Sequence, residues 1–186
     1  MAFRIVIGDV TIGIQGQDFA YIFSVGMGGM ESLYKDGKEW LYRAPRPAFW
    51  RAVTDNDRGN GFVFRSAVWS AADRFVRCVK VTARMDEQEI SMPPAPENNK
   101  YNGDETCDRF EISYTYETPT VPVTEVTVSY LVESDGRIHV QVDYLGKQGL
   151  PELKIFNAHS GGRLYLRRFV RRDLSGPYGR RNSRCV

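Results

Sequence analysis

The 186-residue sequence has the length of one domain of ordinary size. Hydrophobic residues make up 42% and aromatic residues 12% of it, enough to build a core, which excludes a disordered chain. The net charge of +2 averages two unlike parts: residues 1–156 hold 17 Lys and Arg against 22 Asp and Glu, whereas residues 157–186 hold eight Arg and one Asp.

The sequence shows neither a targeting signal nor a cysteine spacing typical of disulfide bonds. No run approaches the roughly 18 apolar residues of a membrane-spanning helix. The first residues lack the basic region, apolar run and small-residue cleavage site of a signal peptide. The wide spacing of Cys78, Cys107 and Cys185 fits neither a disulfide framework nor a zinc site. We therefore expect a protein of the reducing cytoplasm.

The first quarter of the chain predicts short β-strands. The runs are rich in β-branched and aromatic residues and are separated by turn residues, as hairpins require. The turn signal Lys35-Asp36-Gly37 separates the last two of them. The predicted strands are 3–7, 10–14, 19–23, 30–34 and 39–42.

Later segments alternate strictly between apolar and polar residues. This alternation runs through residues 110–116, 126–132 and 138–144. A period of two over three segments indicates an antiparallel sheet with one buried face. Residues 66–75 favour one or two helical turns, whereas residues 92–100 contain three prolines and cannot form a central strand. The fold class that follows is all-β, most simply a sandwich.

The segment PRPAFWRAVTDNDRGNGF, residues 45–62, is the most unusual in composition. Its Asp55-Asn56-Asp57 begins like a calcium loop, but Asn60 and Ser66 stand where an EF-hand needs Gly and Glu. The two aspartates could also form an acid/base pair for glycoside hydrolysis, which needs carboxyl groups roughly 5–9 Å apart. We favour a third interpretation, in which the aspartates cap loop amides and pair with arginines 51 or 58.

The neighbouring aromatic pair and the histidines give no catalytic signal. Phe49 and Trp50 could stack on a sugar ring, but aromatic residues beside prolines are more often part of the core, which we favour. His139 alternates with apolar neighbours and is expected on the polar face of its strand. Because no Ser-His-Asp, Cys-His or metal-ligand spacing is present, we assign no catalytic or metal-binding residue. Aromatic and basic residues are not interleaved in residues 1–156, so a nucleic-acid surface is not expected.

A family resemblance explains residues 45–62. Together with the preceding KEWLY, this segment closely resembles the start of the C-terminal β-sandwich domain of family 2 β-galactosidases. It is most similar to the separately encoded small subunit of the heterodimeric enzymes of lactic acid bacteria. IGDVTIGIQGQDFAYIFS, GGMESL, APENN and GLPEL match as well, so that the resemblance covers residues 4–156. Val53 departs from the Pro or Thr that is frequent there.

The resemblance implies a fold and a partner. The fold would be an antiparallel supersandwich of the galactose-mutarotase type, of which this chain holds the N-terminal half. It would pack on a catalytic (β/α) barrel in the large subunit, which carries the two catalytic glutamates and the Mg²⁺. The chain itself would hold no cofactor, and its partners would be that subunit and a β-galactoside such as lactose.

The resemblance also implies roles for residues of this segment. A loop would border the sugar site, and the residues before it would support that loop and the subunit interface. The expected loop residues are Gly59, Asn60, Gly61 and Phe62. The expected supporting residues are Phe49, Trp50, Arg51, Asp55, Asn56, Asp57 and Arg58.

Residues 157–186 do not continue the resemblance. We divide the chain into a partial small-subunit domain, residues 1–156, and a basic tail that is either out of frame or disordered. A neighbouring reading frame can encode family-like Gly-Glu-Thr-Tyr and Asp-Arg-Met motifs there, which would make the chain truncated after residue 156. Two further functions stay open: a free-standing carbohydrate-binding sandwich and an inactive remnant.

Overall fold

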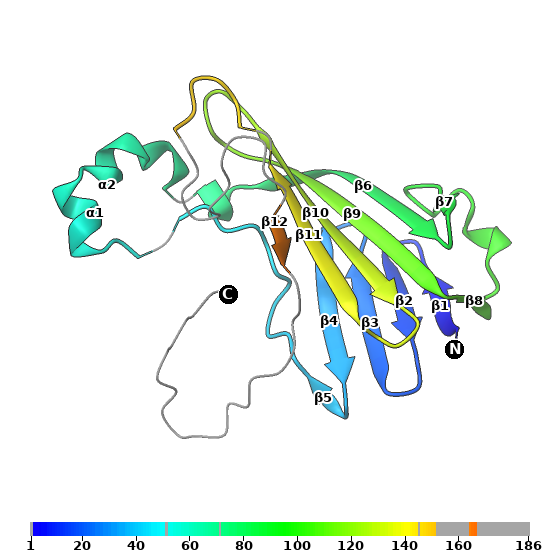
Figure 1. The fold of residues 1–186 in the computed structure, drawn as a ribbon. Helices are drawn as coiled ribbons and strands as arrows, with labels where there is room; N and C mark the ends of the chain where they lie inside the picture. Colours follow the sequence, from blue (N-terminus) through cyan, green and yellow to red (C-terminus); the bar gives the residue numbers. More distant parts are fainter. Residues whose placement is uncertain (1, 51, 71, 145, 152–163, 167–186) are drawn as a thin grey trace.

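Two six-stranded sheets face each other in the computed structural model, which describes residues 2–50, 52–70, 72–144, 146–151 and 164–166 (Figure 1). Every strand pairing between neighbours is antiparallel. The prediction of an all-β sandwich is therefore confirmed.

The first sheet is built mainly from the N-terminal hairpins. Its order is β5-β4-β3-β2-β1-β8. The strands are β1 (Phe3–Ile7), β2 (Thr11–Gln15), β3 (Phe19–Ser24), β4 (Gly29–Lys35), β5 (Lys38–Glu39) and β8 (Glu105–Cys107). The first four strands confirm the prediction. The fifth is shorter than the predicted 39–42, because the Glu39 carboxylate accepts the amides of Leu33 and Leu41, each at 2.9 Å, and bends the chain away from the sheet.

The second sheet contains the three alternating segments. Its order is β12-β11-β10-β9-β6-β7. The strands are β6 (Arg77–Met85), β7 (Gln88–Ile90), β9 (Arg109–Glu117), β10 (Glu125–Glu133), β11 (Ile138–Tyr144) and β12 (Leu164–Leu166). The central three, β9 to β11, are the predicted strands. β12 falls within the predicted basic tail, and the other residues of 157–186 lie outside the described part of the chain.

Five short helical elements connect the strands in the described part of the chain. They are α1 (Asp55–Gly59), α2 (Phe62–Arg65), and the 3-10 helices η1 (Ala67–Trp69), η2 (Ala72–Arg74) and η3 (Asn98–Lys100). The helical turns predicted within residues 66–75 are η1 and η2. The expectation that Asp55 and Asp57 lie in a loop is wrong, because α1 occupies Asp55–Gly59. Of the expected loop residues, Gly59 ends α1 and Phe62 begins α2.

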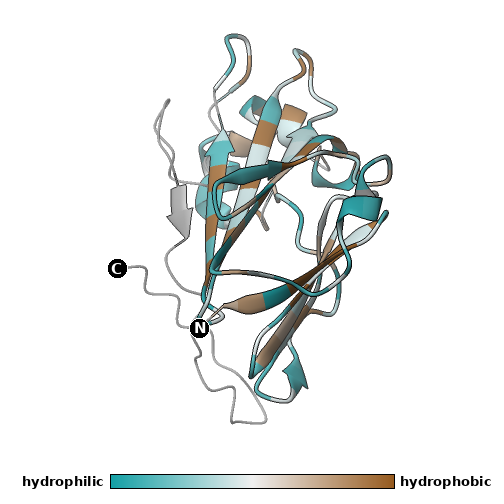
Figure 2. Ribbon diagram, turned by 90° about the vertical axis from the view of Figure 1, so that its right-hand side faces the viewer, coloured by the Kyte–Doolittle hydropathy of each residue, from teal (hydrophilic) through white to brown (hydrophobic). Residues whose placement is uncertain are grey.

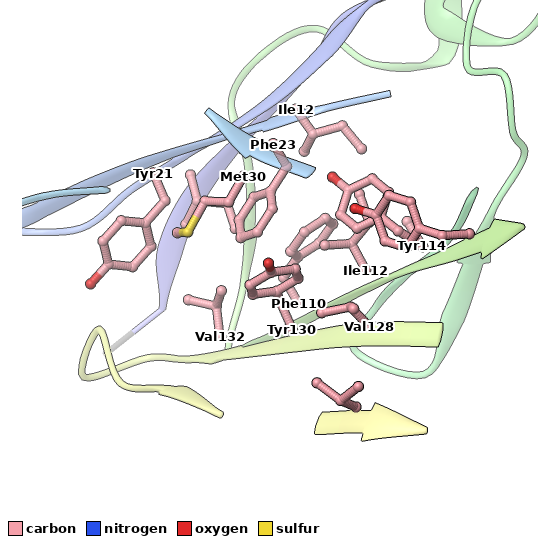
Figure 3. Close-up of a cluster of buried hydrophobic side chains, with 14 of the residues drawn as sticks. Ile12, Tyr21, Phe23, Met30, Phe110, Ile112, Tyr114, Val128, Tyr130 and Val132 are labelled. Carbon is pink, nitrogen blue, oxygen red and sulfur yellow. The ribbon is translucent and has the colours of Figure 1, made fainter. Parts of the chain in front are cut away.

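The core fills the space between the two sheets (Figure 3). The Phe23 ring lies 5.7 Å from the rings of both Phe110 and Tyr130, so the first sheet packs directly on the second. Figure 2 shows apolar and polar residues following one another along the strands, as expected when one face of each sheet is buried.

Buried tyrosines join the sheets by hydrogen bonds as well as by packing. The Tyr114 hydroxyl donates to the carbonyl of Gly29 at 3.2 Å, and the Tyr21 hydroxyl donates to the carbonyl of Gly136 at 2.7 Å. Burial raises the pKa of Tyr114 and of Tyr130, the latter to about 12. The core therefore holds these phenols in their neutral form.

Several smaller predictions can also be placed. His139 is exposed on β11, as predicted, and its Nε2 lies 3.0 Å from a Glu133 carboxylate oxygen. Cys107 is buried and Cys78 half-buried, and both are free thiols; Cys185 lies outside the described residues. Across the described ranges, no helix is long and apolar enough to span a membrane.

Candidate functional site

The second half of the segment 45–62 projects from the sandwich (Figure 1), whereas Phe49 in its first half belongs to the core. After β5 the described residues have no regular secondary structure up to the start of α1, and α1 and α2 stand away from both sheets (Figure 1). We call residues 54–65 the α1–α2 arm. All of the predicted site residues lie in the arm or directly before it, and Arg51 among them lies outside the described residues.

A capping box starts the arm. Asp57 Oδ2 accepts the backbone N–H of Thr54 at 2.9 Å and its hydroxyl at 2.7 Å. In return, the Thr54 hydroxyl oxygen accepts the Asp57 N–H at 3.3 Å. Each side chain thus satisfies a backbone donor that the start of a helix leaves unpaired. Asp57 is buried and has the capping role that the sequence predicted for the aspartates.

The other aspartate lies on the opposite side of α1. Asp55 is exposed, and its Oδ1 is 3.1 Å from Nη1 of Arg58, the second of the two arginines predicted as partners. The arrangement does not unite Asp55 and Asp57 around one site, because one carboxylate caps the helix while the other faces solvent. Within the described ranges, no group of three or more His, Cys, Asp and Glu side chains could hold a metal ion.

Asn60 links the two helices. Its N–H donates to the carbonyl of Asn56 at 3.0 Å and closes α1. Its side-chain oxygen accepts the N–H of Phe62 at 3.0 Å and lies 3.4 Å from Nη2 of Arg65. Between the helices Gly61 has a φ of +72°, in the left-handed region that favours glycine. The tip of the arm therefore has a defined conformation.

The described structure gives no reason why residue 59 has to be a glycine. The φ of Gly59 lies outside the left-handed region, and among the described residues no atom of another part of the chain lies within 4 Å of the position that a Cβ would take. An alanine would fit there without strain, and it would favour the helix. The absence of a side chain at this exposed position is therefore not required by the folded chain.

Two aromatic stacks attach the arm to the sandwich. Phe49, which is 1% exposed, stacks on Trp69 at 5.6 Å between ring centroids. Trp50 stacks on Phe62 at 5.2 Å, and Phe62 is 3% exposed. The prediction that Phe49 belongs to the core is confirmed.

Trp69 continues this contact into the second sheet. Its ring meets Tyr144 of β11 edge-on at 5.9 Å, and its Nε1–H donates to the carbonyl of Pro151 at 3.2 Å. The sequence did not predict Trp69 as a supporting residue, because its only signal there was a place in the helical turns of residues 66–75. The stack fixes the base of the arm on the sandwich.

The predicted loop residues therefore differ in their surroundings. Gly59 and Asn60 are exposed, and Gly61 is partly exposed. The side chain of Phe62 is buried and faces Trp50, so that any contact of this loop with another molecule has to come mainly from its backbone and from Asn60.

The comparison with known proteins assigns this fold to a family. The family model described as "Beta galactosidase small chain" matches residues 15–160. The chain belongs to the β-galactosidase small-chain family. The whole α1–α2 arm lies within the matched range, as do most strands of both sheets.

Individual relatives of this small chain fall into two kinds. A β-galactosidase small subunit from Latilactobacillus sakei is 49% identical over 172 residues, which are 92% of this chain and 54% of that protein. A match of this length continues beyond residue 156 into the basic segment. The chain spans about half the length of this relative.

The other relatives are longer single chains. A β-galactosidase from Clostridium acetobutylicum is 39% identical over 152 residues, 82% of this chain and 15% of that protein. One from Streptococcus thermophilus is 32% identical over 153 residues, 82% of this chain and 13% of that protein. The small-chain module thus occurs both in a separate subunit and within a much longer protein.

Proposed function

We propose that the chain is a non-catalytic component of a β-galactosidase. It would assemble with a large subunit that contains the catalytic barrel and the Mg²⁺, and the complex would hydrolyse terminal β-D-galactosides such as lactose. The relatives' two arrangements carry this proposal, since the module is a separate small subunit in one of them and part of a longer β-galactosidase chain in others. A cytoplasmic location remains a prediction.

The small-chain domain can keep the same contact with the rest of the enzyme whether the two are parts of one chain or separate subunits. A domain that packs on the rest of an enzyme within one chain has a surface shaped for that contact. When the same domain is encoded separately, this surface has to hold the two subunits together without a linker, and the protein then functions as a heteromeric complex.

We further propose that Gly59, Asn60, Gly61 and Phe62 border the sugar site of that complex. Two observations support this role. The arm extends away from the sandwich, so that its tip can reach a second subunit (Figure 1). In addition, Gly59 lacks a side chain at a place where the chain itself would accept one, which is expected if another molecule approaches the backbone closely.

Phe49, Trp50 and Arg51 would support that loop and the subunit interface, together with Asp55, Asn56, Asp57 and Arg58. The stacks of Phe49 and Trp50 support this role, because they attach the arm to a buried core and restrict its motion. A loop held in this way loses little conformational entropy when the complex forms.

The test is reconstitution with the large subunit of the same organism. The rate of o-nitrophenyl-β-galactoside hydrolysis is measured for the large subunit alone, for this chain alone and for the mixture. We expect saturable activation by the chain, and none with the Phe49→Ala variant, which removes the base of the arm. Complete activity of the large subunit alone, unaltered by saturating folded chain, would refute the proposal.

A further inference from the structure

Phe64 is the most exposed phenylalanine among the described residues. Its exposed fraction is 87%, while its neighbour Phe62, two residues earlier on α2, is 3% exposed. The two side chains leave the short helix in different directions, since residues two apart do not share a helix face. Packing of Phe62 on Trp50 therefore turns Phe64 outward.

A single exposed apolar residue is common, but this one lies on an ordered tip. The capping box of Thr54 and Asp57 fixes the start of the arm, and Asn60 bonds to the backbone of α2 and lies beside the Arg65 guanidinium. The backbone that carries Phe64 therefore has a defined conformation before any partner binds. Preorganised aromatic side chains lose little entropy on binding and are frequent among the residues that dominate interface energies.

The charge of this region differs from that of its surroundings. Residues 43–77 contain seven Arg, no Lys and three Asp, whereas residues 1–42 and 78–156 together contain ten Lys and Arg and nineteen Asp and Glu. Arg58 and Arg65 are exposed on the arm, on either side of its tip. Arginine is enriched in interfaces because its planar guanidinium can form paired hydrogen bonds with carboxylates.

We propose that Phe64 is the residue that docks the α1–α2 arm on the large subunit, by entering an apolar pocket whose rim carries carboxylates for Arg58 and Arg65. This inference rests on the proposed function. The large subunit is the occupant that the charge pattern and the relatives favour. Residues 43–77, which contain the arm, carry a net charge of +4 from seven Arg and three Asp, which calls for an acidic protein surface, and the module is joined to the remainder of a β-galactosidase in the longer relatives.

The experiment compares two exposed phenylalanines. Phe64→Ala and the matched control Phe75→Ala, whose side chain is 70% exposed and lies outside the arm, are titrated against the immobilised large subunit. Truncation of a central interface residue weakens binding by about 30-fold or more, and that of a peripheral residue by only a few fold. We expect the first effect for Phe64→Ala, the second for Phe75→Ala, and unchanged thermal unfolding midpoints for both.

Arginine variants test the proposed charge contacts. Arg58→Gln with Arg65→Gln should weaken binding at low salt and make the affinity less dependent on ionic strength, because screened charge pairs are then lost. An affinity that keeps the salt dependence of the wild type would contradict the carboxylate rim.

The outcomes separate the inference from the proposed function. No binding by the folded wild-type chain overturns the proposed function, and tight binding to a short DNA duplex in its place would assign the basic segment 43–77 to nucleic acid. Wild-type affinity of Phe64→Ala overturns only the docking role. A lower unfolding midpoint of Phe64→Ala with unchanged affinity also overturns the docking role, because Phe64 would then pack within the small subunit. So does a lower turnover at saturation with unchanged affinity, because Phe64 would then touch the substrate.

Discussion

Two glycines of the arm predict stability changes of opposite sign. Gly61 adopts a φ of +72° between α1 and α2, so that an alanine there has to occupy the left-handed region. This costs about 1 kcal/mol. Gly59 is the last residue of α1, and its φ lies outside that region. A methyl group added there would meet no atom from elsewhere in the described part of the chain within 4 Å. Alanine in place of glycine in a helix stabilises it by about 0.5–1 kcal/mol.

The two variants should therefore differ from each other by about 1.5–2 kcal/mol, although the chemical change is the same. For a chain of this size, 1 kcal/mol shifts the thermal midpoint by about 2–4 °C. Gly61→Ala should lower the midpoint by this amount, and Gly59→Ala should leave it unchanged or raise it slightly. Circular dichroism during heating measures both.

The same pair also separates stability from function. If the backbone at Gly59 approaches the sugar site, Gly59→Ala should reduce the activity of the reconstituted complex although the chain is no less stable. A fall in the midpoint for Gly59→Ala equal to that for Gly61→Ala would refute the account of the arm. Full activity of Gly59→Ala would refute the proposed close approach at this residue.

Three other changes test the arm and the core. Asp57→Ala should cost about 0.5–2 kcal/mol of unfolding free energy because it removes the capping box. Asp55→Ala removes an exposed ion pair and should cost less than about 1 kcal/mol. Equal losses for the two variants in urea unfolding would contradict this difference. Phe49→Ala should cost about 3–5 kcal/mol by emptying its place beside Trp69, and a loss below about 1 kcal/mol would show that the arm is not packed on the core. Burial raises the pKa of Tyr130 to about 12, so that between about pH 10 and pH 12 only the unfolded chain releases this proton. The contribution of Tyr130 to stability should be constant up to about pH 9 and fall by about 1.4 kcal/mol per pH unit above about pH 10. A urea midpoint unchanged up to about pH 11 would contradict this.

The sequence predicted the strands whose one face is completely buried. β9 and β10 alternate strictly between buried and less buried positions, and their period of two was visible. β6 was missed because Ala83 is its only buried residue, and the other positions are exposed or half-exposed in no regular order. The three-residue strands β7 and β8 are too short for any period to be detected.

The arm and the residues directly before it contain both predicted and unpredicted features. The pairing of Asp55 with Arg58 and the burial of Phe49 follow from local chemistry and were predicted. The helix α1 was not, although Thr54 and Asp57 stand at the spacing of a capping box. The division between buried Phe62 and exposed Phe64 depends on where Trp50 lies, a tertiary contact that no local pattern gives.

Sedimentation velocity of the two purified proteins shows whether this chain associates with the large subunit of a β-galactosidase. We expect the folded chain to move from its own slow boundary into a faster one with the large subunit, at a fixed stoichiometry that saturates. The Phe64→Ala variant should need a higher concentration to do so. Two independent boundaries at every ratio, with wild-type chain that is folded by circular dichroism, would contradict the account.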